Sequence, residues 1–318
     1  MFKFSKEQVV YDIAGVKVGG QPGEYPTALA GTIFYKGHKI VKDPKTGDFD
    51  KAAAEDLIKK QDEMSDITGN PCMVQVFSEF EEAMRKYIDF VASITDAPML
   101  IDSTEAKVRV YGARYAKEVG LADRVIYNSI NVSATEEELK GVKESGIESA
   151  IVLAFNPKGG GVKDRIDVLV NGAGMAPKGL IDLAKDCGIK KFLIDVAVLP
   201  IGTSAGQALM ATYVVKAKFG YPAGSGVHNA VSSWVWLLGL KKDRPDGKEI
   251  FKHVDVATNA MQVMMGANFV LYGPIGNASL VFPVCATADA MIAEAVSWEF
   301  KEVQPAEYHP YKKLVSGS

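Results

Sequence analysis

The chain has 318 residues, 47% of them hydrophobic, and its 36 basic and 39 acidic side chains give a formal net charge of −3. This near balance argues against a nucleic-acid-binding surface. The sequence shows no apolar run near the ~20 residues that a membrane span requires, and no signal-peptide stretch from Met1 to Glu7. We therefore expect a cytoplasmic protein with no direct membrane span.

The chain alternates predicted strands and helices almost to its end. A hairpin is predicted over residues 9–18, with its turn near Ala14-Gly15, and the predicted strands cover residues 31–35, 73–77, 98–102, 124–128, 149–155, 191–195, 221–223 and 268–272. The predicted helices cover residues 50–68, 79–94, 105–118, 135–146, 179–187, 204–219, 231–240, 253–265 and 286–300. Thr135 and Glu138 fit a capping box. The segment from Asn156 to Lys178 is predicted to be a long connection.

Eight strand–helix units of roughly 30 to 40 residues each predict a TIM (β/α)8 barrel. A doubly wound sheet is the rival architecture, but it requires no fixed count of eight units. Every predicted strand is apolar throughout, as is typical of a parallel strand that is covered on both faces. We therefore expect an α/β fold in which residues 1–318 form a single TIM-barrel domain, with a short N-terminal extension over residues 1–30.

The most informative stretch runs from Gly224 to Trp234, at a corner between a short strand and a helix. In a parallel α/β protein such corners lie at the carboxyl ends of the strands, where ligands bind. Asn229 stands at the tip of this corner, and Gly224 and Gly226 leave the backbone room to move. The alternative is that Asn229 only caps the next helix.

Similar polar residues follow other predicted strands: Asp102, Asn128 and Asp195. In a barrel these residues and Asn229 would converge on one mouth, which suits a flat heterocycle with amide and amino edges. A carboxylate can accept hydrogen bonds from a ring N–H and an amino group together, and a carboxamide can donate to a carbonyl. Any one of them could instead be a helix cap.

Other chemistry is poorly supported by the sequence. Cys72, Cys187 and Cys285 form no C-x-x-C pair, and the four histidines form no metal-binding pattern, so we expect no metal site. There is no dinucleotide-binding glycine motif, no Walker loop and no nucleophile elbow. His228 is the only histidine on a candidate active-site corner.

Several of these segments together resemble a known family. The run Leu193 to Pro200 and the corners at Ile101-Asp102-Ser103, Asn128-Ser129-Ile130 and Gly226-Val227-His228-Asn229 resemble the pterin-binding methyltransferases. The segments 19–26, 151–156 and 271–275 are more specifically similar to the H subunits of the methanogen tetrahydromethanopterin S-methyltransferases. The resemblance extends over nearly the whole chain.

This resemblance implies a TIM barrel that takes methyl-tetrahydromethanopterin, or its sarcinapterin variant, as substrate. The N5-methyl group would pass to the Co(I) of a corrinoid, a cobamide carried by a partner subunit. Such proteins act as homodimers, peripheral to a membrane complex that then methylates coenzyme M. By position, Asp102, Asn128, Ser129, Asp195 and Asn229 would bind the pterin, and Asn229 would be catalytic, near N5.

The residues fit this reaction, because a tertiary amine leaves poorly and N5 needs a proton or a hydrogen bond as the methyl departs. Three other functions stay open. A related barrel methyltransferase would demethylate a small methylated amine onto a soluble corrinoid protein, and a non-enzymatic barrel would bind pterin as a scaffold. A synthase or dehydratase of the pterin-binding class would need a basic phosphate site, for which Lys178 and Lys191 are poorly placed.

Overall fold

The computed structural model describes residues 2–315, which build a closed barrel of eight parallel strands. Around the barrel the strands follow the order β10-β11-β12-β3-β6-β7-β8-β9. They are β3 (Ala28–Ile33), β6 (Cys72–Phe77), β7 (Met99–Asp102), β8 (Val125–Ile130), β9 (Ser149–Leu153), β10 (Lys191–Asp195), β11 (Ala223–Ser225) and β12 (Phe269–Pro274). This arrangement confirms the predicted TIM barrel.

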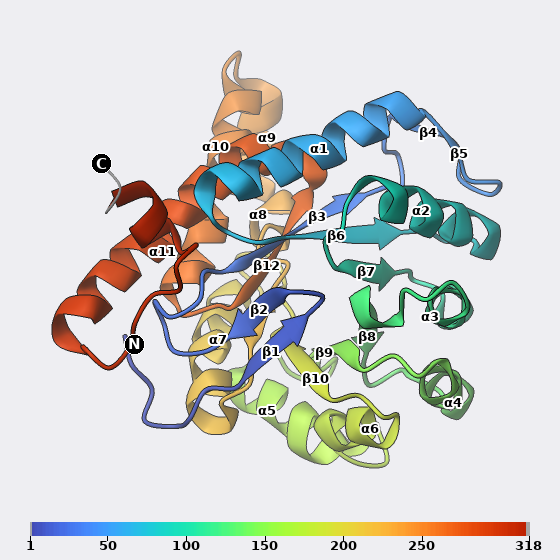
Figure 1. Cartoon of the computed structure of the whole chain (residues 1–318), viewed down its shortest axis with the longest axis horizontal. Helices are drawn as coiled ribbons and strands as arrows, with labels where there is room; N and C mark the ends of the chain where they lie inside the picture. The colour runs from blue at the N-terminus through green and yellow to red at the C-terminus, as the bar shows by residue number, and fades with distance from the viewer. Residues whose placement is uncertain (1, 316–318) are drawn as a thin grey trace.

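Helices surround the strands, as Figure 1 shows. They are α1 (Lys51–Thr68), α2 (Glu81–Ile94), α3 (Ala106–Glu118), α4 (Glu136–Ser145), α5 (Val162–Asn171), α6 (Leu180–Asp186), α7 (Ala205–Phe219), α8 (Asn229–Ser232), α9 (Val235–Asp243), α10 (Gly247–Met264) and α11 (Ala278–Glu299). Local signals set several of their ends. Asp50 caps α1 by accepting a hydrogen bond from the Ala53 N–H, and Gly69, Gly146 and Gly220 end their helices in the left-handed conformation.

The predicted N-terminal hairpin is present as β1 (Val10–Ile13) and β2 (Val16–Gly19). Ile13 and Val18 are fully buried in the same apolar cluster as the residues that fill the barrel interior. The hairpin therefore closes one end of the barrel, and Figure 1 shows it lying across the strands. A second small hairpin, β4 (Val41–Asp43) with β5 (Asp48–Phe49), follows β3.

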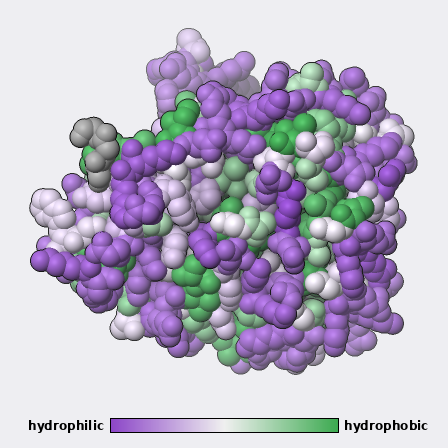
Figure 2. All heavy atoms as spheres, viewed as in Figure 1, coloured by the Kyte–Doolittle hydropathy of each residue, from purple (hydrophilic) through white to green (hydrophobic). Residues whose placement is uncertain are grey.

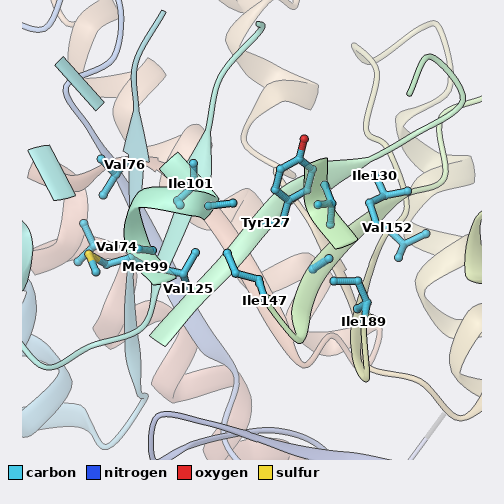
Figure 3. Packing of buried hydrophobic residues seen from close by; sticks show 14 of the residues in the cluster. Val74, Val76, Met99, Ile101, Val125, Tyr127, Ile130, Ile147, Val152 and Ile189 are labelled. Atoms are coloured by element: carbon cyan, nitrogen blue, oxygen red, sulfur yellow. The ribbon is translucent and has the colours of Figure 1, made fainter. Parts of the chain in front are cut away.

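Two apolar layers hold the barrel together. The inner layer is formed by alternate strand residues that include Ala30, Met73, Leu100, Ile126 and Leu193. The intervening residues point outward against the helices, and Figure 3 shows this outer layer along β6, β7 and β8. Full burial of a side chain as large as Met73, Leu100 or Ile126 stabilises a protein by about 1.5–3 kcal/mol relative to exposure.

Some predicted boundaries were wrong. The predicted connection from Asn156 to Lys178 contains a helix, α5, and the strand predicted over residues 31–35 lies at Ala28–Ile33. The helix predicted over 286–300 begins at Ala278, although Pro283 stands within it. Pro283 is exposed, whereas Val281 and Phe282 are buried against the barrel, so tertiary packing favours the longer helix.

The greater length of α11 also bears on membrane spans. The segment Ile275–Glu299 is long and apolar enough, by length and composition alone, to cross a membrane, which the sequence analysis did not identify. Half of its most apolar window is buried inside the protein, as expected of a core helix packed on a barrel.

Candidate active site

The inner face of the barrel changes from apolar to polar at the carboxyl ends of the strands. Because side chains alternate along a strand, residues two positions apart face the same way. Three predicted site residues follow an inner apolar residue at this spacing: Asp102 follows Leu100, Asn128 follows Ile126, and Asp195 follows Leu193. They therefore share one mouth, at the end of the barrel where all eight strands finish.

Asp102 is held by a chain of side-chain hydrogen bonds across three neighbouring strands. Gln75 Nε2 on β6 donates to Asp102 Oδ2 on β7 at 2.6 Å, and Thr32 Oγ1 on β3 donates to Gln75 Oε1 at 3.0 Å. Burial raises the pKa of Asp102 to about 6, against the opposing effects of the Gln75 hydrogen bond and the Arg109 charge. The sequence analysis missed Thr32 and Gln75. The prediction that every strand is apolar throughout was wrong at these two positions, where a polar side chain occupies an inner position of an otherwise apolar strand.

Asp195 is the more deeply buried carboxyl group, only 7% exposed. Its Oδ1 accepts a hydrogen bond from the backbone N–H of Ala197 at 2.7 Å. Burial raises the pKa of Asp195 to about 7, while the Ala197 hydrogen bond and the Arg165 charge oppose this shift and the Asp102 charge adds to it. Burial is therefore the largest cause of the raised pKa at both mouth carboxyl groups.

Asn128 and Ser129 lie beside Asp102. Asn128 is a direct register partner of Asp102, inside β8 rather than after it, because the strand continues to Ile130. The peptide bond between Asn128 and Ser129 is cis, and the pairing of β8 with β9 shifts register there. Ser129 is buried and does not line the mouth cavity. Pterin binding by these two residues stays a prediction.

Asn229 is exposed at the mouth, as the first residue of α8. A Cβ atom on Gly226 would lie 2.9 Å from Asn229 Nδ2, so this glycine makes room for the carboxamide. Gly273, at a φ of 85°, makes room for the His228 ring, which a Cβ atom would approach to 2.8 Å. Burial lowers the pKa of His228 to about 4, so its imidazole is neutral at neutral pH.

None of the four predicted residues caps the helix that follows it. The N-cap positions after β7, β8, β10 and β11 are occupied by other residues: Glu105, Thr135, Ser204 and His228. The helix-cap alternative is therefore wrong for Asp102, Asn128, Asp195 and Asn229.

Two buried arginines support the carboxylate corners from outside the strands. Arg109 on α3 donates to the Ser103 carbonyl at 2.5 Å, next to Asp102. Arg165 on α5 donates to the carbonyls of Val196 at 2.5 Å and Ala197 at 2.8 Å, next to Asp195. No sequence signal identified either arginine, because arginine is usually exposed.

Arg109 also has an ion-pair partner. It donates to Glu138 Oε1 at 2.5 Å, and the Tyr127 hydroxyl donates to the same oxygen at 2.5 Å. The predicted capping box is only half formed. The Glu138 N–H donates to Thr135 Oγ1 at 3.2 Å, but the Glu138 carboxylate binds Arg109 and Tyr127 instead of the helix terminus.

A cavity of about 220 Å³ occupies the mouth. Its polar lining consists of Thr32, Gln75, Asp195, His228 and Asn229, with apolar walls from residues such as Leu153 and Phe155. Apolar walls with a few placed polar groups are typical of a small-molecule site. Asp195 and Asn229 line it directly, and Asp102 is linked to it through Gln75.

The polar groups suit a heterocycle with both donors and acceptors. Carboxyl groups can accept from ring N–H and amino groups, while carboxamide N–H groups can donate to carbonyl or ring nitrogen atoms. Within residues 2–315, no group of three or more His, Cys, Asp or Glu side chains is arranged to hold a metal ion.

Comparisons with known proteins match this barrel to a family. Residues 6–304 match the family model described as "Tetrahydromethanopterin S-methyltransferase MtrH subunit". The chain is 54% identical to the H subunit of the tetrahydromethanopterin S-methyltransferase of Methanothermobacter thermautotrophicus, covering 99% of this chain and 100% of that protein. It is 48% identical to the H subunit of the putative methyltransferase mtx of Methanosarcina acetivorans, again over 99% and 100% of the two chains.

Among solved structures, the barrel is similar to Yersinia pestis DHPS with a pterine-sulfa conjugate. The TM-score is 0.60 at 12% sequence identity, and the match covers 90% of this chain and 100% of that chain. At this identity the likeness concerns the fold alone.

Proposed function

The chain belongs to the family of tetrahydromethanopterin S-methyltransferase MtrH subunits, and from this we propose that it transfers the N5-methyl group of methyl-tetrahydromethanopterin, or of the sarcinapterin variant, to the Co(I) of a corrinoid on a partner subunit. The protein is a methyltransferase subunit of methanogenesis. The observation that carries the finer proposal is the mouth cavity, where Asp195 and Asn229 share one lining.

In the proposed reaction the N5–CH3 bond breaks and the cobalt electron pair forms the new Co–CH3 bond. The electron pair of the broken bond stays on N5, which takes up a proton. Asp102, Asn128, Ser129 and Asp195 would hold the ring, the carboxyl groups by accepting from its donors. Electron density builds up on N5 as the methyl group leaves, so a hydrogen bond donated to N5 is stronger in the transition state than in the ground state. We propose that Asn229 donates this hydrogen bond.

Single-turnover methyl transfer to free cob(I)alamin tests this role. We expect Asn229→Ala to lower the rate by about tenfold to a thousandfold, the scale of losing one polar catalytic contact, while pterin affinity falls much less. Asn171→Ala, on the exposed end of α5, is the matched control and should transfer methyl at the wild-type rate. If the methyl-transfer rate and the pterin affinity of Asn229→Ala fall by equal factors, Asn229 only binds the pterin and has no catalytic role.

The second candidate is demethylation of a small methylated amine onto a soluble corrinoid protein. One observation keeps it in view: the 48% identical relative is named only as part of a putative methyltransferase, mtx, and this name specifies no pterin. The same assay separates the two functions. Methyl transfer from a methylamine, but not from methyl-tetrahydromethanopterin, would favour the second.

We propose that the corrinoid-bearing subunit docks beside the mouth, on α9. Val235 and Trp236 there are 82% and 56% exposed. Trp234, at the start of α9, and Val198, which lines the mouth cavity, pack against the same small apolar cluster, so α9 lies near the site. Trp236→Ala should weaken binding of the corrinoid partner but leave the rate with free cob(I)alamin unchanged. Unchanged partner binding would reject this surface.

We propose that a second copy of the chain covers α11 in a homodimer. Outward positions repeat along α11 at alternating steps of four and three residues, as in a helix–helix seam: Leu280, Val284, Thr287, Met291, Glu294 and Trp298. Met291 and Trp298 are 59% and 73% exposed. By contrast, Figure 2 shows a largely hydrophilic margin at the lower right, over α4 and α6. Met291→Asp should yield monomers in sedimentation experiments, whereas Lys140→Asp on α4 should not.

We also propose that the whole chain acts as one domain, peripheral to the membrane complex that methylates coenzyme M. The burial of Ile13 and Val18 in the barrel interior supports the single domain. Limited proteolysis should then release no stable fragment that lacks the N-terminal hairpin.

A further inference from the structure

A second cavity, of about 280 Å³, is lined by residues at the carboxyl ends of β3 and β6, among them Phe34 and Phe77. These two strands are hydrogen-bonded neighbours. Thr32 and Gln75 line the mouth cavity, while Phe34 and Phe77, two positions further along the chain in each case, line the second cavity. A ligand in the mouth could therefore extend directly into the second cavity.

The walls of the second cavity are rich in flat rings. Phe34 stacks on Tyr87, with ring centroids 3.9 Å apart and an interplanar angle of 11°. Tyr35 stacks on His38 at 4.3 Å and 9°. All four residues line the cavity together with Phe77. Stacked rings offer apolar, planar surfaces that suit an aromatic group.

One lining residue, Tyr87, carries a buried polar group that has no protein partner among the described residues. Tyr87 is only 1% exposed, and its hydroxyl has no hydrogen-bond partner among the described residues. Leaving a buried hydroxyl without a partner costs about 1–3 kcal/mol, which favours a ligand atom as its partner.

His38 supplies a second donor. Its Nδ1 accepts a hydrogen bond from the backbone N–H of Phe34 at 3.2 Å. In the neutral imidazole the proton must then be on Nε2, which is a donor. Lys36 on the same loop lines the cavity and adds a positive charge. The cavity lining thus combines aromatic rings with polar side chains that include one cation, Lys36, and one carboxylate, Glu79.

We propose that this cavity binds the aryl group of the substrate's side arm, together with the polar atoms next to it. The proposal rests on the proposed function, since a reduced pterin that carries one-carbon groups bears an arylamine arm on its ring. With the ring system in the mouth, the aryl group lies between the aromatic walls. In this proposal the Tyr87 hydroxyl and His38 Nε2–H form hydrogen bonds with polar atoms of the arm.

The test compares tetrahydromethanopterin with 6-methyltetrahydropterin, which has the same type of ring system but no aryl arm. Equilibrium binding of both ligands is measured for the wild-type protein, Tyr87→Phe and His38→Gln. Tyr87→Phe keeps the stacked ring, so the fold is retained. Tyr111→Phe, on the outer surface at α3, is the matched control.

We expect the wild-type protein to bind tetrahydromethanopterin at least tenfold more tightly than the armless pterin. Tyr87→Phe and His38→Gln should each weaken binding of tetrahydromethanopterin by about three- to tenfold, the loss of one hydrogen bond. Affinity for the armless pterin should not change, and Tyr111→Phe should match the wild type for both ligands.

Two outcomes would overturn the aryl-arm site alone: equal wild-type affinity for the two pterins, or equal loss of affinity for both pterins in Tyr87→Phe. Failure of the wild-type protein to bind either pterin would instead overturn the proposed function and this site with it.

Discussion

The corners at Asp102 and Asp195 occupy equivalent places in the barrel but are built differently. Each carboxyl group ends a strand, and each has a buried arginine bound to a carbonyl just beyond it. Asp102 receives a hydrogen bond from the Gln75 side chain, whereas Asp195 receives one from its own loop backbone. The pKa of Asp102 is raised to about 6 and that of Asp195 to about 7.

The arginines differ more strongly. Arg109 is neutralised by Glu138, with side chains that are 8% and 3% exposed. Arg165 forms no ion pair with any described residue, and donates to loop carbonyls and to Ser204 Oγ at 3.2 Å. The Asp102 corner is therefore charge-balanced, whereas the Asp195 corner keeps an unpaired cation near a carboxyl group whose pKa is raised by burial.

The largest expected effect concerns the two arginines. Arg109→Met leaves Glu138 buried without its cation and should lower the free energy of unfolding by about 3–5 kcal/mol. The double variant Arg109→Met/Glu138→Leu should recover most of this loss in urea unfolding. Arg165→Met should also lower the free energy of unfolding. No second substitution of a carboxylate should recover this loss, because Arg165 has no ion-pair partner among the described residues. A double variant as unstable as Arg109→Met would show that the Arg109–Glu138 pair is not the balancing element.

The next effect concerns how the free energy of unfolding depends on pH. An Asp side chain in the unfolded chain titrates near pH 3.9, whereas the pKa values of Asp102 and Asp195 in the folded protein are about 6 and about 7. Each group therefore contributes stability that is fully present below about pH 4 and is lost as the pH rises through its folded pKa. Asparagine cannot ionise. Asp195→Asn should therefore raise the free energy of unfolding at pH 8 by about 2–4 kcal/mol and Asp102→Asn by about 1–3 kcal/mol, with little gain at pH 4. Urea unfolding at both pH values measures this, and the reverse order would contradict the comparison.

A somewhat smaller effect is expected on ligand affinity. Asp195→Ala should weaken pterin binding by about 1.5–3 kcal/mol, because a charged hydrogen bond is lost. The turnover of bound substrate should change less, since the contact exists in both ground and transition state. Fluorescence titration and single-turnover rates separate the two quantities. Unchanged pterin affinity would reject Asp195 as a ring-binding residue.

The smallest effect concerns the support of Asp102. The Gln75 hydrogen bond lowers the pKa of Asp102, so Gln75→Leu should raise that pKa above its present value of about 6. Carbon-detected NMR of the aspartates should show this rise while the pKa of Asp195 stays near 7. Thr32→Val, which removes only the donor to Gln75, should shift the Asp102 pKa less. An unchanged titration of Asp102 in Gln75→Leu would mean that the amide does not stabilise the carboxylate.

The sequence predicted the barrel because its signals are local. Apolar runs mark the strands, and Gly69, Gly146 and Gly220 end helices by a conformation that glycine adopts easily. The same logic placed Asp102, Asn128, Asp195 and Asn229 at strand ends. The predicted ends of strands and helices were wrong where tertiary packing overrode the local preference of the sequence. Phe34, for example, takes a φ of 62°, so β3 ends at Ile33.

The sequence by itself determined the repeated strand–helix units and the polar residues near the carboxyl ends of the strands, since each depends on neighbours within a few positions. Only the tertiary structure decided how those residues are held and charged. Gln75 meets Asp102 across 27 residues, Arg109 meets Glu138 across 29, and Arg165 meets the Val196 carbonyl across 31. Burial then set the pKa values of the two carboxyl groups, because desolvation depends on the surrounding protein and not on adjacent residues.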